Sequence, residues 1–160
     1  MPDGELIRRA ATAAEIARAR ALFEEYAASI GVDLCFQNFD HELATLPGAY
    51  APPRGTLLVA ASGERLMGCV ALRPLRSGDC AIGEVKRLYV RSDARGSGLG
   101  RALALRVIAD ARAIGYRELK LDTLPTMAAA RALYASLGFR ECEAYYHNPV
   151  DGTVYMRLVL

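Results

Sequence analysis

Three glycines at alternate positions lie between a run of strand-forming residues and a helical pattern. They belong to the segment Arg95-Gly96-Ser97-Gly98-Leu99-Gly100-Arg101. The first N–H groups of a helix have no internal acceptor and the helix dipole adds partial positive charge there, so this turn is predicted to bind an anion. The glycines let phosphate oxygens approach the backbone, and Arg95 and Arg101 can donate charge-assisted hydrogen bonds. The expected chemistry is the binding of a diphosphate.

Two common nucleotide-binding motifs do not fit this turn. Arg101 stands where the third glycine of the dinucleotide fingerprint G-x-G-x-x-G would fall. No lysine followed by serine or threonine comes after Gly100, so the groups with which a P-loop holds terminal phosphates and magnesium are missing. A dinucleotide-binding oxidoreductase domain is a rival hypothesis, and a loop that only turns the chain is another.

Length and composition limit the class of protein. The 160 residues fit one domain, residues 1–160, and 52% hydrophobic with 24% charged residues are typical of a globular protein. The formal net charge of +2 offers no strong field for a nucleic acid or an anionic membrane surface. Residues 1–9 lack the continuous apolar run of a signal peptide or membrane span, so we expect a cytoplasmic protein.

The cysteines and histidines do not indicate a metal site. The four cysteines include no C-x-x-C pair, which argues against a zinc site and a dithiol redox motif. His41 and His147 have no carboxylate or thiol companions at ligand spacing. We therefore expect chemistry that uses no metal.

Hydrophobic patterns predict the elements that position the turn. Strands are expected at about 6–9, 56–61, 66–72, 81–90, 119–124, 139–146 and 153–159, helices at 12–30, 99–114 and 127–137, a shorter helix between 36 and 46, and a turn at 77–79. Thr12 and Glu15 match a capping box, and a glycine follows each of the three longer helices. Strict alternation along the 81–90 strand would place one set of side chains on a single face, namely Glu84, Lys86, Leu88 and Val90.

The glycine turn and a second segment together resemble the GNAT-type N-acetyltransferases. The family's pyrophosphate motif Q/R-x-x-G-x-G/A is matched by residues 95–100, and its A-x-x-L-Y-x-x-x-G-F segment is matched by residues 130–139. The resemblance implies an α/β fold with a mixed, mainly antiparallel central sheet flanked by helices. It also implies that two central strands, 84–90 and 119–124, splay apart to admit the pantetheine of acetyl-coenzyme A. The expected reaction is direct acetyl transfer to a primary amine.

The resemblance also implies which residues hold acetyl-coenzyme A. They are the glycine turn, the open edge of the preceding strand and the start of the second helix, that is Leu88, Val90, Arg95, Gly96, Ser97, Gly98, Leu99, Gly100, Arg101 and Thr126. In the family the backbone of the strand pairs with the pantetheine amides, and an N–H there stabilises the charge that develops on the acyl oxygen. The family often has asparagine where this chain has Met127, so Thr126 or the backbone would replace that contact.

Two residues are predicted to transfer protons. Tyr134 occupies the position of the family's general acid. The role is chemically reasonable, because a phenol with a pKa of about 10 stays protonated at neutral pH and can donate to the departing thiolate. The acceptor amine arrives as an ammonium and needs a base, for which Glu84 is the candidate and a water chain the alternative. Tyr134 as an ordinary core aromatic and Glu84 as an ion-paired glutamate are the competing interpretations.

Several choices remain open at the acceptor end. Lys86, Arg87 or Arg73 would select a substrate carboxylate, and residues 145–149 would form either the acceptor wall or ordinary strand packing. The acceptor is expected to be a small molecule such as an amino acid or a polyamine. An acylated cysteine, Cys69 or Cys80, is the mechanistic rival, and a non-catalytic acyl-coenzyme A sensor is the functional one. Small domains of this type often pair, so a homodimer is a further hypothesis.

Overall fold

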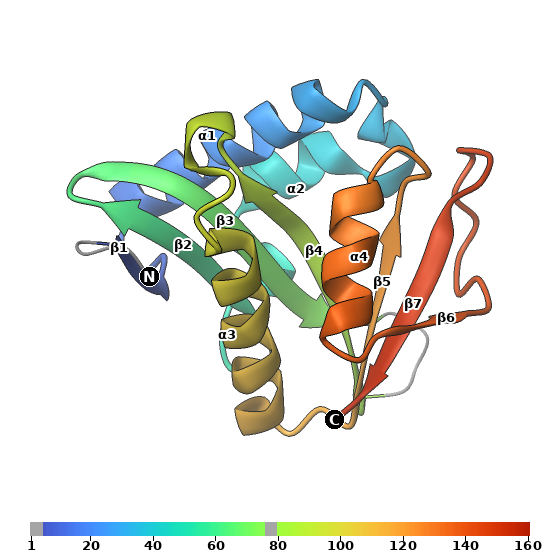
Figure 1. The fold of residues 1–160 in the computed structure, drawn as a ribbon. Coiled ribbons are helices and arrows are strands. Elements are labelled where there is room, and N and C mark those ends of the chain that lie inside the picture. Colours follow the sequence, from blue (N-terminus) through green and yellow to red (C-terminus); the bar gives the residue numbers. More distant parts are fainter. Residues whose placement is uncertain (1–4, 76–79) are drawn as a thin grey trace.

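A seven-stranded sheet forms the centre of the computed structural model, which describes residues 5–75 and 80–160 (Figure 1). Its strands are β1 (Glu5–Arg9), β2 (Thr56–Ser62), β3 (Arg65–Pro74), β4 (Ile82–Val90), β5 (Glu118–Thr123), β6 (Arg140–Cys142) and β7 (Val154–Val159). The order across the sheet is β1-β2-β3-β4-β5-β7-β6, and β4 pairs with β5 in parallel while the other neighbours are antiparallel. The predicted mixed, mainly antiparallel α/β fold is confirmed.

Helices cover both faces of the sheet (Figure 1). They are α1 (Ala13–Ile30), η1 (Leu34–Gln37), α2 (Phe39–Thr45), η2 (Gly48–Tyr50), η3 (Ser92–Ala94), α3 (Leu99–Ile114) and α4 (Ala128–Ser136). The predicted N-cap of α1 is present, since Thr12 Oγ1 accepts from Glu15 N–H, and Gly31 ends the helix with a φ of 64°. Among the described residues no helix is both long and apolar enough to cross a membrane.

Two hydrophobic cores lie on opposite faces of the sheet because its strands alternate. One core joins the sheet to α3 and α4 and includes Leu58, Val70, Leu72, Val85, Leu103, Val107, Leu119, Leu121, Tyr134 and Phe139. The other joins the sheet to α1, α2 and η2 and includes Leu22, Phe23, Phe39, Tyr50, Leu57, Val59, Cys69 and Ala71. Burying both faces fixes the register of the central strands, because a slip of one residue would exchange the two cores.

The parallel pair at the centre of the sheet separates after three residues. Ile82, Gly83 and Glu84 of β4 pair with residues 118–120 of β5, and β5 then continues in register with β7 alone. A side chain at Gly83 would approach Leu119 and Leu72 to 3.0 Å, so glycine keeps the paired part tight. The predicted splay of the two strands is confirmed, and it leaves one edge of β4 without a neighbouring strand beyond Glu84.

A β-bulge at Arg87 changes which way the side chains of β4 point. The register moves from Ala71 opposite Lys86 to Cys69 opposite Tyr89, and Arg87 has a φ of 62°. Leu88 accordingly packs with Val85 in the core beneath α3, whereas Lys86 bonds to η1 on the other face. The expectation that Glu84, Lys86, Leu88 and Val90 share one face is therefore wrong beyond Lys86, because the extra residue shifts the alternation by one.

The last hairpin also differs from the sequence prediction. The strand expected at 139–146 ends at Cys142 as β6, and residues 143–149 form a loop. The loop carries Tyr145 and Tyr146, whose hydroxyl groups donate to the buried carboxylates of Glu84 and Asp122. To make these hydrogen bonds, the backbone of the loop leaves the position in which it would pair with β7, so β6 is short. The turn expected at 77–79 lies outside the described residues.

Candidate active site

A cleft of about 370 Å³ opens where β4 and β5 separate. Its walls come from β4, the end of β5, the start of α3, α4, the last turns of α1, the helix η1 and the loop after β6. The lining includes Tyr26, Gln37, Lys86, Arg87, Leu88, Val90, Arg95, Gly100, Asp122, Met127, Tyr134 and Asn148. The fold thus brings together residues from positions 26 to 148 of the chain.

The open edge of β4 presents backbone groups to this cleft. The N–H of Arg91 donates to the carbonyl of Met67 on β3 at 2.9 Å. Because backbone groups alternate along a strand, the N–H and C=O of Val90 and Leu88 point the other way, toward the cleft. The Arg95 Nε bonds the carbonyl of Val90 at 3.0 Å from that side. The two residues expected to pair with pantetheine therefore have the required orientation.

The glycine turn at the mouth of α3 exposes helix N–H groups. Its first helical bond runs from Ala102 N–H to the carbonyl of Gly98 at 3.0 Å, so the N–H groups of residues 99–101 precede it. Gly96 and Gly98 have φ values of 83° and 84°, and a Cβ at either would meet no atom within 4 Å. This open space beside bare N–H groups fits a diphosphate, and the positive φ values require glycine.

The other residues predicted to bind the coenzyme differ in their positions. Arg95 lines the cleft, whereas Arg101 is exposed and donates to Ser136 Oγ at 3.0 Å. The Ser97 hydroxyl donates to the carbonyl of Ala94, and the Leu99 side chain is buried in the core, so these two residues can offer only backbone groups. Thr126 is exposed and does not line the cleft, which its neighbour Met127 does.

Tyr134 reaches the cleft from α4. It is 8% exposed and packs edge to face on Phe139, with ring centroids 5.5 Å apart. Burial raises the pKa of its phenol, so the hydroxyl stays protonated across the physiological range and acts as a hydrogen-bond donor. Its place in the cleft lining and its raised pKa are compatible with the acid role, which stays a prediction.

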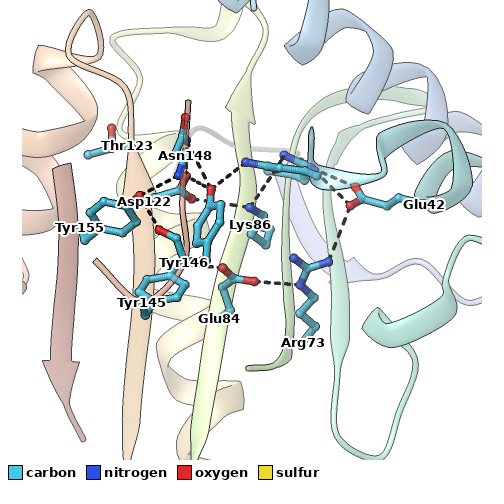
Figure 2. Close-up of polar contacts among 12 residues, drawn as sticks. Glu42, Arg73, Glu84, Lys86, Asp122, Thr123, Tyr145, Tyr146, Asn148 and Tyr155 are labelled. Carbon is cyan, nitrogen blue, oxygen red and sulfur yellow. Dashed lines mark hydrogen bonds and ion pairs between the residues drawn. The ribbon is translucent and has the colours of Figure 1, made fainter. Parts of the chain in front are cut away.

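A buried polar network lies at the side of the cleft where we expect the acceptor (Figure 2). Lys86 Nζ donates to Gln37 Oε1 at 3.0 Å and lies 3.5 Å from Asp122 Oδ1. Asp122 also accepts from Asn148 Nδ2 at 3.0 Å and from the hydroxyl of Tyr146. Burial acts to raise the pKa of Asp122, but Lys86 and these hydrogen bonds outweigh burial and lower it.

The remaining charges pair with one another beside this network (Figure 2). Arg87 donates to both carboxylate oxygens of Glu42, at 2.9 and 3.0 Å, and to Gln37 at 2.8 Å. Arg73 donates to Glu84 at 2.8 Å, and Glu84 accepts a second bond from Tyr145 at 2.7 Å. Both arginines therefore pair with carboxylates of the protein itself, Arg87 in a bidentate way with Glu42 and Arg73 through its Nε with Glu84.

Glu84 lies near the cleft but does not line it. Its side chain is 5% exposed, and its two oxygens are taken by Arg73 and Tyr145. A base must reach the proton it removes, so this position favours the ion-paired interpretation, and the role of Glu84 as the base stays a prediction. Cys69 is fully buried outside the cleft lining, and burial raises the pKa of its thiol, which disfavours an acylated cysteine at this position.

Sequence reasoning missed two residues of the polar network, Asp122 and Gln37. Asp122 follows buried Leu121 near the end of the strand beside β4, so its placement could have been inferred from the parallel pair. Gln37 ends the short helix η1 and carries no such signal. Asn148 lies in the run 145–149, which was predicted to form either the acceptor wall or strand packing. Within the described part of the chain, no group of three or more His, Cys, Asp or Glu side chains could hold a metal ion.

Splayed parallel strands, a helix start with free N–H groups and a buried tyrosine line one cleft, as expected of an acyltransferase of the GNAT type. Residues 11–139 match the acetyltransferase (GNAT) family, and 140 residues are 45% identical to an uncharacterized N-acetyltransferase of Schizosaccharomyces pombe, covering 87% of this chain and 85% of that protein. The chain belongs to the GNAT family and is an acetyl-coenzyme A-dependent acyltransferase.

Solved structures share the fold over the whole chain. An acetyltransferase from Streptococcus agalactiae superposes with a TM-score of 0.80 at 20% identity, covering 99% of each chain. A GCN5-related N-acetyltransferase from Kribbella flavida gives 0.74 at 25% identity, covering 100% of each chain. The acetyltransferase yncA from Salmonella typhimurium, solved with acetyl-coenzyme A, gives 0.69 at 24% identity over 98% of this chain and 94% of that one.

Proposed function

We propose that the protein transfers the acetyl group of acetyl-coenzyme A directly to a primary amine of a small molecule. The observation that carries the proposal is the meeting of three features in one cleft. These are the outward-facing backbone of Leu88 and Val90, the bare N–H groups after Gly98, and the protonated phenol of Tyr134. Together they supply donor binding, charge stabilisation and a proton.

Each residue has a distinct part in the transfer. The N–H groups of residues 99–101 and Arg95 bind the diphosphate, and the edge of β4 binds the pantetheine amides. A backbone N–H near Leu88 stabilises the negative charge on the acyl oxygen, and Tyr134 donates a proton to the departing sulfur. Residues of the glycine turn contribute mainly backbone, whereas the roles of Arg101 and Thr126 would need movement of their exposed side chains.

The small size of the acceptor is supported by the way the cleft ends. The polar network around Lys86 and Asp122 closes it with side chains that are 3% and 8% exposed. The names of similar proteins differ on this point. One relative, matched over 58% of its length, is the IAA acetyltransferase of Azospirillum brasilense. A solved structure matched over 99% of its length is the ribosomal-protein-alanine N-acetyltransferase of Brucella melitensis. An amino acid or a polyamine fits the closed end better than a folded protein surface. The proposal includes one domain, a cytoplasmic location and a homodimer. Light scattering of the purified protein would test the homodimer.

A free-thiol release assay tests the proposed activity. Purified protein is incubated with acetyl-coenzyme A and a panel of amino acids, polyamines and amine antibiotics, with a panel of N-terminal peptides alongside. The proposal expects thiol release with at least one small amine and a product that is heavier by one acetyl group. If coenzyme A binds but no amine causes thiol release from acetyl-coenzyme A, the protein would be the non-catalytic sensor instead. Thiol release with peptides alone would contradict the small-molecule acceptor.

A further inference from the structure

One lysine is buried at the acceptor end of the cleft. The side chain of Lys86 is 3% exposed and lines the same cleft as Tyr134. The bulge at Arg87 separates the directions of Lys86 and Leu88, so the lysine faces the acceptor network while the backbone of Leu88 faces the donor. An amine nitrogen thus lies in the lining of the cleft to which we assign the acetyl transfer.

The surroundings of Lys86 do not favour a permanent positive charge. The groups that face it are Glu84 and Arg87 on β4, Arg73 on β3, Asp122 on β5, the phenol of Tyr146 in the loop after β6, and neutral Gln37 on η1, with Glu42 on α2 behind Arg87. The two nearby carboxylates favour its ammonium form and the two guanidinium groups oppose it. Burial is the largest influence and lowers the pKa of Lys86, so the neutral amine forms more readily than in an exposed lysine.

We propose that Lys86 is the base that takes a proton from the acceptor's ammonium group, an assignment that rests on the proposed acetyl transfer. The neutral amine of Lys86 accepts one proton, and the freed acceptor nitrogen forms the C–N bond as the C–S bond breaks. The sulfur receives a proton from Tyr134, and the second proton on nitrogen restores the phenol through water. Lys86 then releases its proton to solvent, so the sum is amide, free thiol and one proton.

The neighbours of Lys86 are less suited to this step. Arg87 keeps its proton at any working pH, and Glu84 does not line the cleft. Asp122 does line it, but the bonds from Lys86, Tyr146 and Asn148 lower its pKa and make it a weak base. Its place 3.5 Å from Nζ instead lets it stabilise the ammonium that forms on Lys86.

Substitution of Lys86 by arginine separates charge from proton transfer. Lys86→Arg keeps a cation in the cleft that does not release its proton, so kcat with a primary amine should fall by about 100-fold or more. The matched control is Lys120→Arg, because Lys120 lies on β5 with its Nζ 5.7 Å from the Tyr145 ring and does not line the cleft. Coenzyme A affinity measured by calorimetry should stay within about twofold in both variants, which also reports their folding.

Rescue by added bases gives a second measurement, because added bases would not restore kcat if Lys86 had only a structural role. Small tertiary amines have no N–H to be acetylated, so they can replace the base without becoming acceptors. In Lys86→Ala they should raise kcat in a manner that depends on their own pKa. With saturating acceptor, the wild-type kcat should rise with pH along a limb that lies below the ordinary lysine pKa, and this limb should be lost in Lys86→Arg.

Several results would overturn the assignment. They are a Lys86→Arg variant with at least half the wild-type kcat, a loss confined to KM, or a Lys86→Ala variant that tertiary amines leave unchanged. Loss of kcat in Glu84→Gln together with full activity in Lys86→Arg would assign the base to Glu84. Failure of the wild-type protein to release thiol with any amine would instead contradict the proposed function. This result can be told apart from failure of the Lys86 assignment, because it is seen in the wild-type protein without any variant.

Discussion

The two ends of the cleft are built from different parts of the chain. The donor end is a continuous stretch, residues 88–101, and it offers backbone groups whose direction is set by strand alternation and by the start of a helix. The acceptor end consists of side chains from η1, β4, β5 and the loop after β6, which meet only in the folded protein. Donor binding is therefore encoded locally, whereas acceptor chemistry is encoded in the tertiary structure.

The difference extends to the electrostatics of the two ends. The donor end has Arg95 in the cleft lining and an exposed Arg101, and it is open to an anion that brings its own charge. The acceptor end holds Lys86, Arg87, Asp122 and Glu42 with side chains no more than 9% exposed, each paired with another. Variants at the acceptor end should accordingly affect folding and catalysis together, and variants at the donor end should affect mainly coenzyme affinity.

The largest effect on stability should follow the loss of a buried anion. Glu42→Ala leaves the Arg87 guanidinium, whose side chain is 2% exposed, without its bidentate partner. The free energy of unfolding in urea should fall by about 3 to 5 kcal/mol. Arg65→Ala, which breaks the exposed pair with Asp93, is the control and should leave the midpoint nearly unchanged. Equal losses in the two variants would contradict the distinction between the buried network and the surface.

The next effect should fall on coenzyme binding. Gly98→Val places a β-branched residue at a φ of 84°, which costs about 1 to 3 kcal/mol, and deforms the turn that holds the diphosphate. The thermal stabilisation by coenzyme A should be largely lost. Gly115→Val imposes comparable strain at a φ of 107° at the other end of α3 and should keep it. A variant at Gly98 that coenzyme A stabilises as fully as the wild type would contradict the assigned donor end.

A smaller effect should follow removal of one hydroxyl between the two ends. Tyr134→Phe keeps the packing on Phe139 and removes the proton donor. Turnover should fall by about 10-fold to 100-fold with little change in coenzyme affinity, because the lost bond acts in the transition state. Steady-state kinetics with calorimetry would check this. Unchanged turnover would contradict the acid role and support the alternative that Tyr134 is an ordinary core aromatic.

The smallest expected effect is on the stability of the folded protein at acidic pH. The pKa of Asp122 is lower in the folded protein than in the unfolded chain, so its stabilisation is present above the unfolded value of about 3.9 and is lost as pH falls below it. Asp122→Asn should therefore show a shallower loss of stability between about pH 5 and pH 2. Denaturation at several pH values gives the slope, and parallel curves for the two proteins would contradict the lowered pKa.

The sequence predicted the local features well because they depend on short patterns. The order of the elements and the Thr12 cap were expected from such patterns and are present. The splay of β4 from β5 was implied by the family resemblance and is also present. The bulge was not expected, because the residue with positive φ is Arg87 rather than glycine. The short β6 was missed for a similar reason, since the bond from Tyr145 to Glu84 spans 61 positions of the chain.

The central claim is that backbone groups at the glycine turn bind the diphosphate, and one pair of titrations tests it most directly. Coenzyme A and pantetheine, which lacks the diphosphate together with the adenosine and its 3′-phosphate, are each titrated into the folded wild-type protein in a calorimeter. Coenzyme A is also titrated into folded Gly98→Val, in which the turn alone is altered and the affinity should fall toward that of pantetheine. Coenzyme A should bind at least about 100-fold more tightly than pantetheine, a difference of about 2.7 kcal/mol. Equal affinities, or no heat with coenzyme A, would contradict the account.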